Sequence, residues 1–152
     1  MVNMGCWTWA DAMLSDQLTA FGDMHEHAGF HAFQSMVASL SFRPEYYNAN
    51  REKLLGSGGV WGALEGRIPT HLRFIEACLG HDIRPHLSDI AAPTLVIHAG
   101  EDMITGPRTT MPLEEGLPNS VGVSMDRVAH VVAGKEEKIV FGKILFDFLN
   151  AH

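Results

Sequence analysis

Two short apolar segments in the second half of the chain, each followed by a polar loop, constrain the fold more than any other feature. Residues 94–99 are rich in β-branched side chains, and residues 121–125 alternate apolar with smaller or polar side chains. Segments of this kind form buried strands of a sheet. The closing segment places Val140, Ile144 and Phe148 on one stripe, which predicts an amphipathic helix. The chain therefore ends in the strand–helix–strand–helix rhythm of an α/β fold.

Chemically active side chains follow both predicted strands. The loop Gly100–Thr105 comes after the first strand and the loop Asp126–His130 after the second. In a parallel sheet, functional groups gather past the carboxyl ends of the strands, so both loops are expected at one edge. A carboxylate at Asp102 can there accept the Nδ1 proton of His130, which fixes the histidine tautomer and stabilises the imidazolium. The pair constitutes the acid–base half of a nucleophilic triad.

A family resemblance is carried by PTLVIHAGEDMIT, then GLPNS, a strand, VAHVV and a closing amphipathic helix. These motifs, which cover residues 86–150, resemble the end of the α/β-hydrolase family. In that family the loop after the seventh strand holds the triad acid and the loop after the eighth holds the histidine. The resemblance implies that Asp102 is the acid and His130 the base. Glu101 is the neighbouring alternative for the acid, and solvated loop residues are the structural alternative for both roles.

Two features depart from the family pattern. Ala129 stands directly before the histidine, where family members often have glycine. The chain also has no G-x-S-x-G elbow, the sharp strand-to-helix turn that presents a serine nucleophile. The GSGG run at residues 56–59 lacks the elbow spacing and a preceding strand. The nucleophile and the oxyanion-hole loop belong to the first five strands of the family fold, which we expect to lie outside this chain.

The first half of the chain shows helical periodicity. Apolar residues recur at helical spacing within residues 14–24 and 30–40. Prolines at favourable starting positions predict two further helices, one over residues 44–55 and one from Pro69 onward. This half looks like the helical cap that many family members insert after the sixth strand, with Met1–Met4 as the tail of that strand.

We therefore predict two regions. Residues 1–85 contain the end of a sheet strand plus the helical cap, and residues 86–152 form the C-terminal core segment. The fold class is α/β, a helical cap segment followed by the last strand–helix units of an α/β-hydrolase parallel sheet.

Charge and composition exclude several classes of partner. The net charge of −7 argues against nucleic acid, because binding phosphates requires clustered Lys and Arg. The two cysteines, Cys6 and Cys78, form no CxxC pair, so a reducing, cytoplasmic setting is expected. No apolar run approaches the ~18 residues of a membrane span, and the N-terminal residues show no signal-peptide pattern.

Cys6 is an alternative nucleophile, because the order Cys6, Asp102, His130 is that of nucleophile, acid and base. An elbow, however, needs small residues two positions to either side, and here these are Met4 and Thr8. An ordinary buried thiol is therefore the preferred interpretation.

Two further groups of residues suggest binding roles. His27 and His31 have the i, i+4 spacing of a helical metal site, but no further ligand stands at a telling distance, so an exposed polar face is preferred. Trp7 follows the predicted sixth strand and is the one aromatic residue we assign to substrate binding. Aromatic residues at helical spacing are otherwise expected in the core.

The resemblance implies a hydrolase that acts on a carboxylic ester or related acyl substrate, without cofactor or metal. The expected partners are a small-molecule substrate and either a second copy or the missing N-terminal part, with no nucleic acid and no membrane. The reaction stays open, since family members with an aspartate nucleophile act on halides and epoxides. The alternative is a non-catalytic fragment that only binds or assembles.

Overall fold

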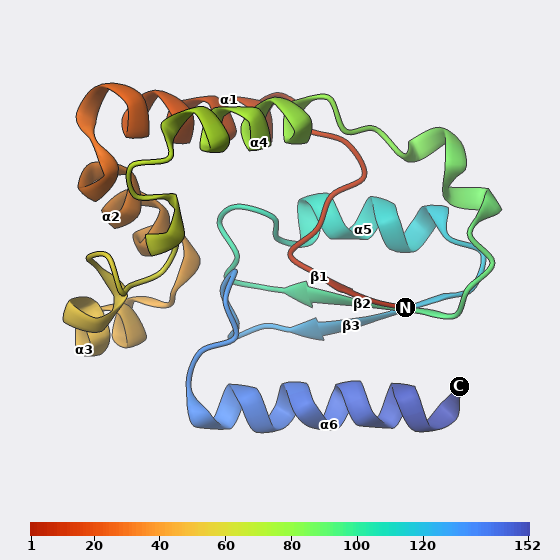
Figure 1. The fold of residues 1–152 in the computed structure, drawn as a ribbon. Helices are drawn as coiled ribbons and strands as arrows, with labels where there is room; N and C mark the ends of the chain where they lie inside the picture. Colours follow the sequence, from red (N-terminus) through yellow and green to blue (C-terminus); the bar gives the residue numbers. More distant parts are fainter.

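A three-stranded parallel sheet forms the centre of the molecule (Figure 1). The structure, a computed structural model, describes residues 1–152. Its strands, in spatial order, are β1 (Val2–Met4), β2 (Thr94–Ala99) and β3 (Ser120–Met125). β2 pairs in parallel with both neighbours, and Ile97 lies between Met4 and Val123. The predicted α/β class and parallel sheet are confirmed.

Two helices cover the two faces of this sheet, α5 (Pro107–Gly116) on one and α6 (Lys135–Ala151) on the other (Figure 1). Every residue of β2 is buried, and its alternate side chains point to opposite faces. Ile97 packs with Phe148 of α6, whereas Val96 packs with Leu113 of α5. The burial of β2 on both faces explains its mostly apolar sequence and fixes the strand from which the first polar loop leaves.

The remaining helices are α1 (Ala12–Asp23), α2 (Phe30–Ser41), α3 (Pro44–Leu54) and α4 (Ile68–Leu79). α1 and α2 correspond to the two periodic segments of the sequence, and α3 and α4 to the two helices predicted from their prolines. The structure adds a π-helical turn, Met24–Ala28, between α1 and α2. It also starts α4 one residue before Pro69, because proline fits the first turn of a helix, where its missing N–H costs no hydrogen bond.

The helical region contacts the loop that follows β2. Leu14 of α1 and Phe33 of α2 share a buried cluster with Ile104, two residues after Asp102. In Figure 1 the strand arrows point towards the side of the molecule where α2 and α3 lie. α2 and α3 therefore lie on the side of the carboxyl ends of the strands, where the two polar loops emerge.

The predicted boundary at residue 85 falls within a short 3₁₀ helix, Arg84–Asp89, and stays a prediction. No helix is both long and apolar enough to cross a membrane.

Candidate active site

The loops after β2 and β3 bring Asp102 and His130 together. The carboxylate Oδ2 of Asp102 lies 3.0 Å from the imidazole Nδ1 of His130. The Asp102 side chain is completely buried, whereas that of His130 is 25% exposed. A triad requires this arrangement, in which a buried acid holds one ring nitrogen and part of the imidazole remains open to solvent.

The two loops approach each other because Gly100 has no side chain. A Cβ at this position would lie 2.7–3.0 Å from the backbone of Asp126, closer than packing allows. Gly100 N–H donates to Met125 O at 3.1 Å, and Glu101 N–H donates to Val128 O at 2.9 Å. These bonds join the loops directly at the ends of their strands.

The helical region holds the far side of the histidine loop. Val131 N–H donates to Ser41 O, at the end of α2, over 3.0 Å. His130 is thus placed between a bond to the helical region and the bonds to the β2 loop, so its position depends on both parts of the fold.

Both oxygens of the Asp102 carboxylate are hydrogen-bonded, Oδ2 to His130 and Oδ1 within its own loop. Its Oδ1 accepts from the backbone N–H groups of Ile104, at 2.8 Å, and Thr105, at 2.9 Å. Burial alone would raise the pKa of Asp102, but the hydrogen bond and charge of His130, together with these two N–H groups, outweigh it. The pKa therefore lies below its usual range, and Asp102 is ionised at neutral pH.

Thr105 is a third member of this cluster that the sequence analysis missed. Its hydroxyl Oγ1 lies 3.2 Å from Asp102 Oδ2 and 3.0 Å from His130 Nδ1. Aspartate side chains commonly accept from the backbone two residues on, so a local turn at Asp102 could be anticipated, but not the contact of the Thr105 hydroxyl. The contact with His130 spans 25 positions and has no local signature.

Gly5, directly after β1, forms a wall of the same site and was also missed. Its φ of +61° is left-handed, and a Cβ there would lie 3.3 Å from Cε1 and 3.4 Å from Nδ1 of His130. By contrast, the alanine that replaces the family glycine at position 129 has no left-handed φ. A methyl group is therefore compatible with the backbone at Ala129, whereas Gly5 is constrained by both conformation and space.

Replacing Gly5 with alanine should displace the His130 ring. Gly66→Ala is the matched control, because Gly66 has a similar φ of +71° and nothing within 4 Å of the added Cβ. Both variants should lose on the order of 1 kcal/mol of folding free energy from backbone strain. Only Gly5→Ala should change the NMR chemical shifts of the His130 ring. Unchanged His130 signals in a folded Gly5→Ala protein would contradict the packing described.

Glu101 does not take the place of Asp102. Its carboxylate accepts from Arg43 Nε at 3.1 Å, and the same guanidinium lies 3.4 Å from Glu137 and 3.5 Å from Glu45. No hydrogen bond joins Glu101 to His130. Glu101 thus ties the β2 loop to the start of α3, and of the two carboxylates it is Asp102 that faces the histidine.

The two nucleophile alternatives within the chain are unfavourably placed. Burial raises the pKa of the Cys6 thiol to about 11, so the reactive thiolate is scarce at neutral pH. Cys6 packs against the cluster of Val96 and Leu113, on the α5 face of the sheet. Ser57 is exposed in the loop after α3, which no strand precedes.

Trp7 lies in a cavity of about 510 Å³ beside β1, which Cys6, Phe74, Cys78 and His81 also line. Its ring meets His81 edge-on at 6.1 Å between centroids. Its indole N–H is buried without a hydrogen-bond partner. Neither Asp102 nor His130 lines this cavity, so the assignment of Trp7 to substrate binding stays a prediction.

The histidine cluster of the helical region is arranged differently from a metal site. No group of three or more His, Cys, Asp or Glu side chains could hold an ion. His27 and His31 are exposed, while the neighbouring His25 is buried and pairs with His71 of α4, Nδ1 to Nδ1 at 2.9 Å. The π-helical turn and the contact from α4, 46 residues away, explain why local spacing missed this pair.

A second hydrogen-bonded series of hydroxyl, imidazole and carboxylate, formed by Thr110, His98 and Glu114, lies between α5 and β2. His98 Nδ1 is 2.6 Å from Thr110 Oγ1, and His98 Nε2 is 2.6 Å from Glu114 Oε2. Thr110 is completely buried, so no substrate can reach its hydroxyl. This series ties α5 to β2 and is structural.

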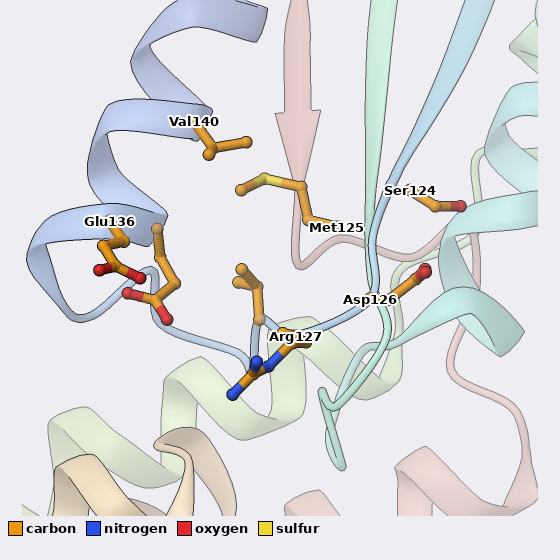
Figure 2. Close-up of a pocket in the computed structure, with 8 residues that line it drawn as sticks. Ser124, Met125, Asp126, Arg127, Glu136 and Val140 are labelled. Carbon is orange, nitrogen blue, oxygen red and sulfur yellow. The ribbon is translucent and has the colours of Figure 1, made fainter.

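A separate cavity of about 370 Å³ opens between the end of β3 and the start of α6 (Figure 2). Met125 and Val140 give it apolar walls, and Arg127, Glu136 and Glu137 supply the charges. Asp102 and His130 do not line it. The cavity is therefore distinct from the Asp102–His130 site.

Comparison with solved structures shows the fold of the C-terminal part of α/β-hydrolases. An α/β hydrolase enzyme from a Medee basin deep-sea metagenome library matches with a TM-score of 0.83 and 20% sequence identity. The match covers 99% of this chain and 55% of that enzyme. No family model matches the chain, and no curated protein sequence matches it.

Two further structures match over almost the whole chain. The enol-lactonase from Burkholderia xenovorans gives a TM-score of 0.78 at 19% identity, with 98% of this chain and 55% of that one covered. A thermophilic esterase gives a TM-score of 0.67 at 23% identity, with 99% and 55% covered. The chain spans about half the length of these proteins.

Proposed function

We propose that this chain supplies the acid and the base of a hydrolase that cleaves carboxylic esters or related acyl substrates. The single observation that carries the proposal is the 3.0 Å contact between buried Asp102 and partly exposed His130, at the carboxyl ends of two neighbouring parallel strands. Two of the similar structures are an esterase and an enol-lactonase, which supports the acyl substrate class.

The proposed mechanism assigns one proton movement to His130. The Nδ1–H is held by ionised Asp102, which leaves Nε2 free to accept the proton of a serine hydroxyl. The serine oxygen attacks the substrate carbonyl, and the imidazolium that forms is stabilised by the Asp102 carboxylate. Nε2 then returns its proton to the leaving alcohol. In the second half of the reaction His130 takes a proton from water, the water oxygen attacks the acyl-enzyme, and the proton returns to the serine.

The serine and the oxyanion hole come, in this proposal, from a segment outside these 152 residues. The outer edge of β1 is the place where that segment would pair, since β1 bonds to β2 on one side only. The cavity of about 510 Å³ beside this edge is largely apolar, and Phe74 at its rim is 59% exposed. Asn3 Nδ2, on β1 itself, is buried without a hydrogen-bond partner. An open strand edge with apolar surroundings favours association with another segment.

The same edge favours a second candidate, a non-catalytic module that assembles through β1. A second copy of the chain is then its natural occupant, because an unpaired strand edge can pair with an identical one. This candidate assigns Asp102 and His130 only a structural role.

One experiment separates the two candidates. The chain is produced alone and together with the sequence encoded upstream of Met1, and turnover of an activated ester is measured in both preparations. Light scattering and denaturing mass spectrometry give the composition of each. We expect saturable turnover only when the upstream sequence is present, and its loss in His130→Ala, because a base without nucleophile and oxyanion hole lacks the main catalytic contributions.

A homodimer of this chain that forms no complex with the upstream product would support the assembly candidate. Turnover by the chain alone that Cys6→Ser abolishes would contradict the proposal and assign the nucleophile to Cys6.

A further inference from the structure

The hydroxyl of Thr105 closes a triangle with the acid and the histidine. Its three sides are Asp102 Oδ2 to His130 Nδ1 at 3.0 Å, Thr105 Oγ1 to His130 Nδ1 at 3.0 Å, and Thr105 Oγ1 to Asp102 Oδ2 at 3.2 Å. Thr105 is only 1% exposed. Because the hydroxyl is shielded from water, its hydrogen bonds must be made with these neighbours.

The chemistry of the three groups determines where the protons lie. Ionised Asp102 can only accept hydrogen bonds, so the single hydroxyl proton of Thr105 is donated to Oδ2. The lone pairs of Oγ1 are then available to a donor, and His130 Nδ1 is the group that faces them. All contacts are satisfied when Nδ1 carries a proton that points between Oδ2 and Oγ1.

The other neutral tautomer of His130 is disfavoured by the same geometry. With the proton on Nε2, the Nδ1 lone pair faces the Asp102 carboxylate at 3.0 Å. The hydroxyl of Thr105 would then have one proton for two acceptors. A buried acceptor without a donor costs free energy, so the triangle selects the Nδ1–H form.

We propose that Thr105 is a positioning residue, whose hydroxyl works with Asp102 to hold His130 as the Nδ1–H tautomer, with Nε2 free. The importance of this tautomer for catalysis rests on the proposed function, because a general base needs its Nε2 lone pair. The tautomer itself is a property of this chain.

Closure of the local turn does not require the Thr105 hydroxyl. The turn is already closed by the two backbone bonds to Asp102 Oδ1, from Ile104 and Thr105. Removing the hydroxyl should therefore leave the loop in place and act on the contact with His130.

The test uses ¹⁵N NMR of the His130 ring, whose two nitrogen shifts report the tautomer ratio. Thr105→Val replaces the hydroxyl with a methyl group of similar size, and Thr105→Ser retains the hydroxyl. In the parent protein and in Thr105→Ser we expect His130 to be mainly Nδ1–H. In Thr105→Val the ratio of Nδ1–H to Nε2–H should fall about tenfold, the equivalent of the one hydrogen bond that Oγ1 accepts from Nδ1–H and that only this tautomer makes.

A second measurement strengthens the test. The pKa of Asp102, followed by ¹³C NMR of its carboxyl carbon, should rise in Thr105→Val because the ionised form loses a donor. If Thr105→Val does not fold, Thr105→Ala and Thr105→Ser form the deciding pair, since they differ only in the hydroxyl. An unchanged tautomer ratio in the folded variant without the hydroxyl would overturn the inference.

Asp102→Asn distinguishes this inference from the proposed function. If Asp102→Asn leaves the tautomer ratio unchanged, the acid does not orient the histidine, and the proposed function loses its basis. If Asp102→Asn changes the ratio and Thr105→Val does not, only the role of Thr105 is refuted. A change in both variants supports the inference.

Discussion

Replacing Asp102 with asparagine should lower kcat of the proposed hydrolase, assembled with its nucleophile segment, by about four orders of magnitude, with the fold retained. The amide has almost the shape of the carboxylate, so packing around the buried side chain changes little. It carries no charge to stabilise the imidazolium, and its N–H₂ group competes to donate to His130 Nδ1. The histidine would then present a protonated Nε2 to the serine and could not accept its proton.

Glu101→Gln is the matched control for this variant. It removes the same charge from the adjacent residue, but Glu101 bonds to Arg43 and not to His130. We expect its kcat to stay within severalfold of the parent, because exposed ion pairs contribute little. Activated-ester turnover gives kcat, and near-ultraviolet circular dichroism verifies the fold. Equal losses in the two variants would show that charge near the loop, not contact with the histidine, is what matters.

The strand–loop units could be predicted because their signals are local. The apolar run of β2 reflects burial on both faces, and a parallel sheet places its carboxyl ends at one edge regardless of other details. The meeting of Asp102 and His130 follows from that topology. The cap helices were likewise visible in their periodicity and in the prolines at their starts.

The contacts that refine the site could not be predicted because they are tertiary. Gly5 reaches His130 from β1, and Thr105 reaches it across the gap between two loops. Neither residue belongs to a sequence motif from which its contact with His130 could be predicted. The contact between His25 and His71 was unpredictable for the same reason. The i, i+4 spacing indicated His27 and His31, which are exposed, and not the buried His25.

The proposed function requires a nucleophile segment, and the open edge of β1 is where that segment would pair. Strand pairing there would extend the sheet next to Gly5, where an added Cβ would lie 3.3 Å from the His130 ring. A nucleophile segment that adds a strand at this edge would thus be placed on the side of the sheet from which His130 is approached. In the proposed function, this chain holds the acid and the base in position for a nucleophile that another segment supplies.

Reaction with a fluorophosphonate, followed by peptide mass mapping, tests the central claim most directly. Such a reagent forms a covalent adduct with a serine that a neighbouring histidine activates. In the hydrolase assembled with its upstream sequence, we predict one adduct, on a serine outside residues 1–152, and its loss in His130→Ala. An adduct on Ser57 or Cys6, or labelling that His130→Ala leaves unchanged, would contradict the assignment of acid and base to this chain and nucleophile to another segment.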